Sequence, residues 1–243
     1  MMAAVACAGC GPSGKLPDRT SKEYGAIVSA FYVGLAALQV GDDLRADDKL
    51  GEVTRLAPGE PAGWANWGAL ALRQRKFDDA SLRLERAREL APQDGHVYYL
   101  LGILESNRGR SAQAIDNLRK AAKFDRLNLR IAFALAQEVE RQGEQGSEAE
   151  FERLLQQIVE TQPDNLAALL ELCRIAAKRG DAATLKSAMD KLGARSAKWP
   201  PEVQAQFAAL QAAVDGADLR AADTRTTLLR NVLWRVPEFR QSF

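Results

Sequence analysis

Histidine is almost absent from this sequence, since His96 is the single histidine among 243 residues. A nucleophile activated by a histidine base, or a zinc site with several histidine ligands, therefore has almost nothing to draw on. The chain also lacks an H-E-x-x-H pair and a glycine-rich phosphate loop that follows a strand. We expect no catalytic residues, no metal and no cofactor, and we expect that the protein is not an enzyme.

Cysteine, proline and net charge are also scarce. Three cysteines (Cys7, Cys10 and Cys173) are too few for a disulfide framework, and a net charge of +1 gives no electrostatic reason to expect nucleic-acid binding. No segment approaches the roughly 18 uninterrupted apolar residues of a membrane span, so we expect no transmembrane helix. Only nine prolines, abundant alanine and leucine, and no long apolar–polar alternation favour an all-helical chain.

What the sequence does contain is an internal period of 34 residues. Three glycines stand one period apart, and so do an alanine, a leucine and a further small apolar residue: Gly34, Gly68 and Gly102; Ala46, Ala80 and Ala114; Leu50, Leu84 and Leu118; Val53, Ala87 and Ala121. Pro58 and Pro92 follow at the same interval. Spacings of four and three place the later columns on one helix face. The period predicts stacked pairs of helices, because one pair cannot bury its apolar face alone.

These columns resemble the signature of the tetratricopeptide-repeat family. The family pattern of Trp, Leu-Gly, Tyr, then Ala, Phe, Ala and Pro matches Trp64, Trp67-Gly68, Ala71, Ala80, Leu84, Ala87 and Pro92. Because Trp64 takes the family's own tryptophan position, we expect both tryptophans to pack within or between helix pairs. The resemblance implies an all-α fold, a right-handed superhelix (α-solenoid) of about five helix pairs with a degenerate capping pair.

The expected organisation follows from the same register. The helix pairs cover residues 27–192, as units of about 27–60, 61–94, 95–128, 129–165 and 166–192. A degenerate capping pair and tail follow at 201–243. Turn positions are expected at Gly41, Gly109, Gly143 and Gly180, because a glycine ends a helix at little cost.

Partners of this family bind mainly to the first helix of each unit, in a concave groove. The register places eleven residues there, and we expect them to contact a partner: Asn66, Arg73, His96, Tyr99, Asn107, Arg130, Phe133, Gln137, Arg141, Arg174 and Lys178. Cations gather toward the later units, which suits a protein or an extended peptide of acidic character. Packing between units is the alternative for Tyr99 and Phe133, and a solvated surface is the alternative for His96 and the arginines. A clamp for chaperone C-termini is disfavoured, because only Asn66 matches it.

The first 26 residues have a different composition from the repeats. Small residues precede Cys10, and a Gly-Pro-Ser-Gly tether follows it, which resembles the end of a bacterial lipoprotein signal. Lipidation of Cys10 would make the protein exported, periplasmic or membrane-anchored, with this anchor as the only link to a membrane. A disordered tail on a cytoplasmic protein, and metal or redox chemistry at Cys7 and Cys10, are the alternatives.

Together these observations predict a non-enzymatic scaffold that binds a peptide or protein in the groove. A second hypothesis is a helical segment of a larger exported protein, since the repeats also resemble those that precede FG-GAP and ASPIC-type propeller domains. In that case the exposed surface would serve assembly or intramolecular docking.

Overall fold

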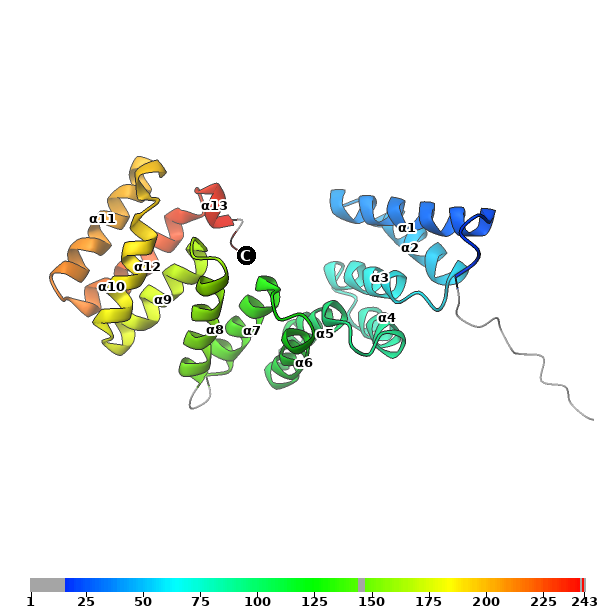
Figure 1. Ribbon diagram of the computed structural model, residues 1–243, viewed down its shortest axis with the longest axis horizontal. Helices are drawn as coiled ribbons and strands as arrows, with labels where there is room; N and C mark the ends of the chain where they lie inside the picture. The colour runs from blue at the N-terminus through cyan, green and yellow to red at the C-terminus, as the bar shows by residue number, and fades with distance from the viewer. Residues whose placement is uncertain (1–15, 144–146, 241, 243) are drawn as a thin grey trace, which may run out of the picture. The chain divides into compact units, whose positions relative to one another are not determined.

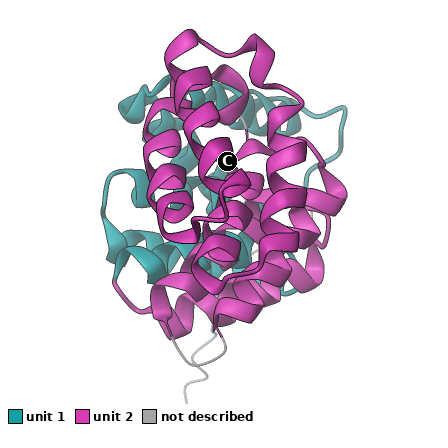
Figure 2. Ribbon diagram, turned by 90° about the vertical axis from the view of Figure 1, so that its left-hand side faces the viewer, with its two compact units in different colours: residues 1–108 teal, residues 109–243 magenta. Residues whose placement is uncertain are grey.

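The computed structural model describes residues 16–143, 147–240 and 242, and every regular element in that part of the chain is a helix (Figure 1). The chain divides into two compact units, residues 1–108 and 109–243, which Figure 2 colours separately. Unit 1 holds α1 (Lys22–Val40), α2 (Asp43–Leu56), α3 (Pro61–Arg73), α4 (Phe77–Leu90) and α5 (Gly95–Asn107). Unit 2 holds α6 (Ser111–Phe124), α7 (Leu129–Gln142), α8 (Ser147–Thr161), α9 (Leu166–Arg179), α10 (Ala182–Gly193), α11 (Pro201–Asp215), α12 (Leu219–Leu233) and α13 (Pro237–Arg240), with a 3-10 turn at Ser196–Lys198.

Helices that follow one another pack in pairs. In unit 1, α1 packs on α2 and α3 on α4, and α2 and α4 each contact the next first helix. In unit 2, α7 packs on α8, α9 on α10 and α11 on α12, while α12 also packs on α9. The expected all-α architecture of helix pairs is confirmed.

The glycine and leucine columns create a close approach between the two helices of a pair. A Cβ atom on Gly68 would lie 2.7 Å from the Cγ and Cδ2 atoms of Leu84, and one on Gly34 would lie 3.0 Å from the same atoms of Leu50. The same contact therefore occurs twice, one period apart. Any side chain at these glycines would press on a fully buried leucine, since proteins pack their cores near crystal density.

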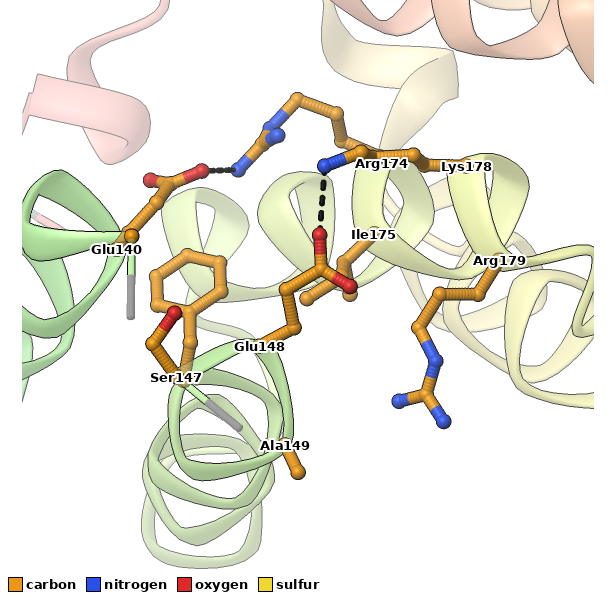
Figure 3. Close-up of a pocket in the computed structure, with 10 residues that line it drawn as sticks. Glu140, Ser147, Glu148, Ala149, Arg174, Ile175, Lys178 and Arg179 are labelled. Carbon is orange, nitrogen blue, oxygen red and sulfur yellow. Dashed lines mark hydrogen bonds and ion pairs between the residues drawn. The ribbon is translucent and has the colours of Figure 1, made fainter. Parts of the chain in front are cut away.

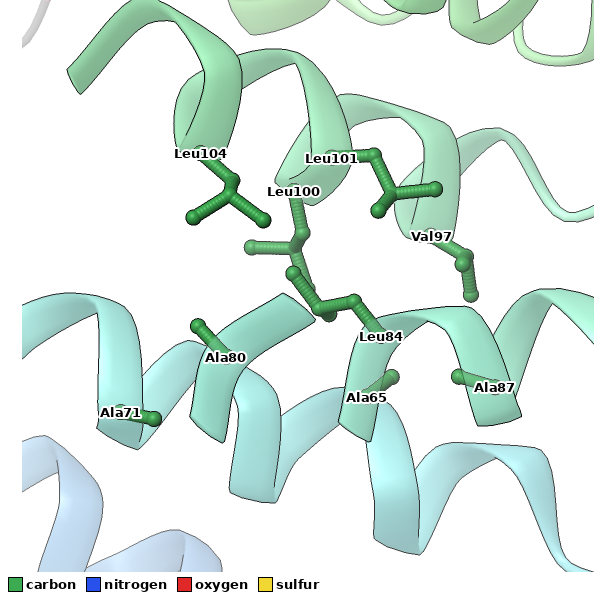
Figure 4. Packing of buried hydrophobic residues seen from close by; sticks show 9 residues of the cluster. All are labelled: Ala65, Ala71, Ala80, Leu84, Ala87, Val97, Leu100, Leu101 and Leu104. Carbon is green, nitrogen blue, oxygen red and sulfur yellow. The ribbon is translucent and has the colours of Figure 1, made fainter. Parts of the chain in front are cut away.

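Small residues continue this packing through the core of unit 1 (Figure 4). Ala80, Leu84 and Ala87 of α4 are fully buried and lie between α3 and α5. Val97 and Leu104 of α5 close the cluster from the other side. The alanines let the helix backbones approach, and the leucines fill the space that this leaves.

The turns between helices contain glycines in the left-handed backbone conformation, as the sequence predicted. Gly41, Gly109, Gly143 and Gly180 have φ between 64° and 80°. Arg75 takes the place of glycine one period after Gly41 and has φ of 58°. Because a side chain makes this conformation unfavourable, Arg75 is a local point of backbone strain.

Trp64 and Trp67 of α3 pack against neighbouring helices. Trp64 packs against the buried cluster that α3, α4 and α5 form, and its Nε1 donates to the carbonyl oxygen of Pro58 at 3.0 Å. The Trp67 indole donates to Asp47 of α2 at 2.7 Å, and the Arg83 guanidinium of α4 lies 3.7 Å from the ring centroid. Trp67 thus joins three helices through one side chain.

The first helix begins earlier than the sequence predicted. It begins at Lys22 and not near residue 27, because the Ser21 hydroxyl caps it by accepting from the Tyr24 N–H at 3.0 Å. By length and composition alone α1 is also apolar enough to cross a membrane; core helices pass the same test, so the expectation of no membrane span is not contradicted. That expectation counted only uninterrupted apolar residues, and small residues such as Gly34 interrupt the run without making it polar. In the structure α1 packs on α2 as the first helix of the first pair.

Candidate functional site

The residues expected to contact a partner all lie on α3, α5, α7 or α9, the first helices of their pairs. Apart from Phe133, which is buried, the structure separates them into three groups: side chains bonded to their own helix, side chains open to solvent, and cations held by ion pairs. The three groups differ in what they can offer a ligand.

Asn66 and Asn107 belong to the first group. The Nδ2 of Asn66 donates to the carbonyl oxygen of Ala62 at 2.8 Å, and that of Asn107 donates to the carbonyl oxygen of Ile103 at 2.8 Å. Each amide is therefore bonded to the turn that precedes it in its own helix. The same bond in two successive units shows that the period extends to polar side chains.

His96, Arg130 and Gln137 belong to the open group and are exposed, and Tyr99 is half-buried. The His96 and Tyr99 rings stack with centroids 6.3 Å apart and form an aromatic step on α5. These side chains have the accessibility that partner binding requires.

The expectation that Phe133 contacts a partner is wrong. Its side chain is 7% exposed, so it belongs to the core of unit 2 and cannot form part of a binding surface. Burial follows from its position in α7, where its neighbours Ile131, Ala132 and Leu135 are also buried by the surrounding helices.

The cations of the third group were expected to face a ligand, but they bond to carboxylates. Arg73 at the end of α3 pairs with Asp43 at the start of α2 and also donates to the carbonyl oxygen of Leu38. Lys178 of α9 pairs with Glu148 of α8 at 2.6 Å, and Arg141 pairs with Glu138 of its own helix at 2.6 Å. Arg73 and Lys178 therefore fasten two helices together as well as meeting solvent, whereas the Arg141–Glu138 pair lies within α7.

Two of these ion pairs, and a third at Arg108, follow a regular spacing in the sequence. Arg73–Asp43, Arg108–Asp78 and Lys178–Glu148 each join residues 30 positions apart in sequence. In each pair, a cation at the end of a first helix meets a carboxylate at the start of the preceding second helix, so both charges complement their helix dipoles. The recurring separation of 30 residues between acid and base is the signal in the sequence that would have revealed these links.

Arg174 is the most elaborately held of the expected residues. Its Nε donates to the buried carboxylate of Glu171 at 2.7 Å, and its Nη2 pairs with Glu140 of α7. Glu171 also pairs with Arg230 of α12 at 3.0 Å. Desolvation alone would lower the pKa of Arg174, but Glu171 and Glu140 outweigh it and raise that pKa above its ordinary value. The network connects α7, α9 and α12.

Arg174 and Lys178 line a cavity of about 640 Å³ in unit 2, which we call the α7–α9 pocket (Figure 3). The end of α7 contributes Glu140, the first turn of α8 contributes Glu148, and the almost fully buried Phe151 and Ile175 lie at its wall. The Lys178 ammonium lowers the pKa of Glu148 by donating a hydrogen bond to its carboxylate, and Arg179 and Arg174 lower it further. The pocket therefore holds ionised groups of both signs.

Unit 1 contains a smaller pocket of a different kind, about 220 Å³, between α1, α2 and α3. Tyr24, Phe31 and Tyr32 of α1 line it together with Val53 of α2, and Glu60 is the charged residue among its described lining residues. We call it the α1–α3 pocket. Sequence reasoning expected Phe31 at the groove but missed Tyr24 and Tyr32, because it considered only the groove positions of this helix.

Three further points concern chemistry. Burial raises the pKa of the Cys173 thiol to about 12, so this cysteine is not a nucleophile at neutral pH. In the described part of the chain, no three His, Cys, Asp or Glu residues come together in a way that could hold a metal ion. Cys7 and Cys10, where lipidation was considered, lie outside the described residues.

Comparisons with known proteins identify the fold. No protein-family model matches the sequence, and no curated protein matches it. Among solved structures, PilF of Pseudomonas aeruginosa superposes with a TM-score of 0.68 at 14% identity, over 91% of this chain and 98% of PilF. PilW, described as a type IV pilus biogenesis factor, gives 0.63 at 15% identity, over 88% and 97% of the two chains. YrrB, described as a tetratricopeptide protein with an unusual peptide-binding site, gives 0.54 at 14% identity, over 71% and 91%. The chain therefore has the all-α fold of the tetratricopeptide-repeat proteins.

Proposed function

We propose that this chain is a non-enzymatic scaffold that binds a protein or an extended peptide through the first helices of its pairs. The observation that carries the proposal is the α1–α3 pocket, in which aromatic side chains of α1 remain open to the surface. Binding energy at protein interfaces concentrates on apolar and aromatic anchors that fill such pockets. Its volume of about 220 Å³ is below the range typical of small-molecule sites, roughly 300–1,000 Å³, and suits one large apolar side chain.

Two further observations support this proposal. Tyr32 is 66% exposed, and the exposed His96 stacks on Tyr99 of α5 within the same unit. Aromatic residues are enriched at interfaces because they supply a large contact area with few rotatable bonds. YrrB, which has the same fold, is described as binding a peptide.

Site-specific photo-crosslinking in cells that naturally produce the protein tests this function. A benzophenone amino acid replaces Tyr32, Tyr99 or, as a control, Leu82, which is 73% exposed on the second helix α4. We expect one protein partner to crosslink from positions 32 and 99 and not from position 82. Equal crosslinking from all three positions, or none from 32 and 99, would overturn the proposal.

We further propose that the protein is exported and carries a lipid anchor at Cys10. The support is the run of small residues before Cys10, and the fold that this chain shares with a pilus biogenesis factor. Labelling the natural host with an alkyne fatty acid should mark the wild-type protein and a Cys7→Ala variant, but not a Cys10→Ala variant. Equal labelling of both variants, or an unlabelled wild type, would refute the anchor.

A further inference from the structure

The α7–α9 pocket contains an arginine whose position is fixed before any ligand arrives. One edge of the Arg174 guanidinium is bonded through Nε to Glu171, a side chain only 9% exposed, which Arg230 also holds. The guanidinium carbon lies 5.8 Å from the Phe151 ring centroid. These contacts use one edge and one face of the guanidinium, so its Nη2 edge is directed toward Glu140 at the pocket (Figure 3).

Glu140 shows what this edge of Arg174 can bind. Its carboxylate pairs with Nη2, in the same way that Glu148 pairs with the Lys178 ammonium (Figure 3). Both are carboxylates of the chain itself, and they occupy places that a ligand carboxylate would fit.

Both internal carboxylates are exposed, and Glu140 is the more easily replaced of the two, because Glu148 lies in the first turn of α8, where the helix dipole favours a negative charge. The side chains of Glu140 and Glu148 are 43% and 53% exposed, and ion pairs at this exposure are worth about 0–1 kcal/mol. Glu140 also lies in the last turn of α7, where the helix dipole disfavours a negative charge. The cations differ, because Arg174 stays anchored by Glu171 when Glu140 leaves, and Lys178 lies in the last turn of α9, where the dipole favours a positive charge.

We propose that the α7–α9 pocket binds an acidic side chain of a partner peptide, which replaces Glu140 on Arg174 and Glu148 on Lys178. The peptide carboxylate would bind between the two cations, and the buried side chains of Phe151 and Ile175 would lie behind it at the wall of the pocket. The volume of about 640 Å³ leaves room for residues that flank the acidic one. This inference rests on the proposed scaffold function and specifies the chemistry of its partner.

Fluorescence anisotropy of the full chain with a labelled hexaglutamate peptide tests this. We expect saturable binding that weakens between 50 and 300 mM NaCl, and no binding of hexaglutamine. We expect Glu140→Gln to bind hexaglutamate about threefold more tightly, because it releases Arg174, and Lys178→Gln to bind about threefold more weakly. Lys178 is chosen for truncation because it makes one exposed ion pair, whereas Arg174 belongs to the partly buried network that connects α7, α9 and α12, and the loss of Arg174 would disturb the fold.

Glu85→Gln is the matched control. Glu85 lies in unit 1, pairs with Arg88, and its side chain is 44% exposed, close to the value for Glu140. Both substitutions add one positive charge, so a gain that depends only on net charge would appear equally in both variants. We expect the Glu85 variant to bind like the wild type.

Three results would overturn the inference: equal gains in the two glutamine variants, unchanged binding by Lys178→Gln in a folded protein, or tighter binding of hexalysine than of hexaglutamate. Thermal unfolding of each variant shows that it is folded. Crosslinking from Tyr32 and Tyr99 depends on unit 1, so success there with failure here would reject the acidic ligand and retain the scaffold. Failure of crosslinking would reject the scaffold itself.

Discussion

Helices α1 and α9 are both the first helix of a pair, yet they are buried to very different extents. α1 has four buried residues, whereas α9 has eleven, although α1 is the longer helix. The difference follows from their neighbours within each unit. α1 packs on α2 and touches α3, while α8, α10, α12 and α13 all contact α9.

This comparison shows that the repeat determines how a pair is built, while the neighbouring helices determine what surface it offers. The aromatic side chains of α1 stay partly exposed and form the α1–α3 pocket. The apolar residues of α9 are covered, so its charged last turns are what reach the α7–α9 pocket. One kind of repeat thus produces an apolar pocket in unit 1 and a charged pocket in unit 2.

The largest effect is expected when the same truncation is made in both helices. Leu169→Ala in α9 removes a fully buried side chain and should cost about 2–5 kcal/mol of unfolding free energy. Leu35 of α1 is only half-buried, so Leu35→Ala should cost about 1 kcal/mol or less. Urea unfolding measures the totals, and hydrogen exchange shows which helices lose protection. Equal costs would mean that α1 is covered as well as α9 is.

Glycine substitutions should have opposite effects on stability inside a helix pair and on the open face of α1. Gly68→Ala puts a Cβ atom 2.7 Å from the buried Leu84 and should destabilise the protein by about 1–3 kcal/mol. Gly25→Ala in α1 has nothing within 4 Å and should stabilise it by about 0.5–1 kcal/mol through helix propensity. Thermal unfolding tests both signs. A neutral Gly68→Ala would show that Leu84 can move aside.

A smaller gain is expected at the strained turn between α3 and α4. Arg75→Gly should stabilise the chain by up to about 1 kcal/mol, because glycine adopts the left-handed conformation without a Cβ penalty. Arg75→Ala is the control, since it removes the guanidinium but keeps the Cβ, and its stability should match the wild type. Equal gains from both variants would assign the effect to the lost charge.

The repeated contacts within a pair could be predicted from the sequence because they recur at a fixed period. The glycine column meets the leucine column, Gly34 at Leu50 and Gly68 at Leu84, and the turn glycines adopt the expected left-handed conformation. These contacts are local, since each joins two helices that follow one another. A period in sequence translates directly into such geometry.

The candidate site was less predictable, because its side chains depend on neighbours that the register does not specify. Register places Arg73 and Lys178 on first helices, but their partners Asp43 and Glu148 lie 30 residues away on another helix. Burial of Phe133 likewise depends on which helices cover α7. The partners of long charged side chains, and the burial of a residue by other helices, therefore become known only from the three-dimensional structure.

The smallest effect concerns pH and separates the charged pocket from the apolar one. Lys178 holds the pKa of Glu148 below its ordinary value of 4.5, with Arg179 and Arg174 adding to the shift. A carboxyl whose pKa is lowered by folding stabilises the native state above its unfolded pKa, and that contribution is lost as pH falls through the folded value. Lys178→Gln should therefore be slightly less stable than the wild type at pH 7, and the difference should shrink as pH drops below about 4.5 or as salt is raised. Tyr32→Phe in the α1–α3 pocket is the control, since its difference from the wild type should not vary over this range. Urea unfolding between pH 3 and 7 measures both, and a Lys178→Gln difference that stays constant with pH would show that Glu148 owes nothing to Lys178.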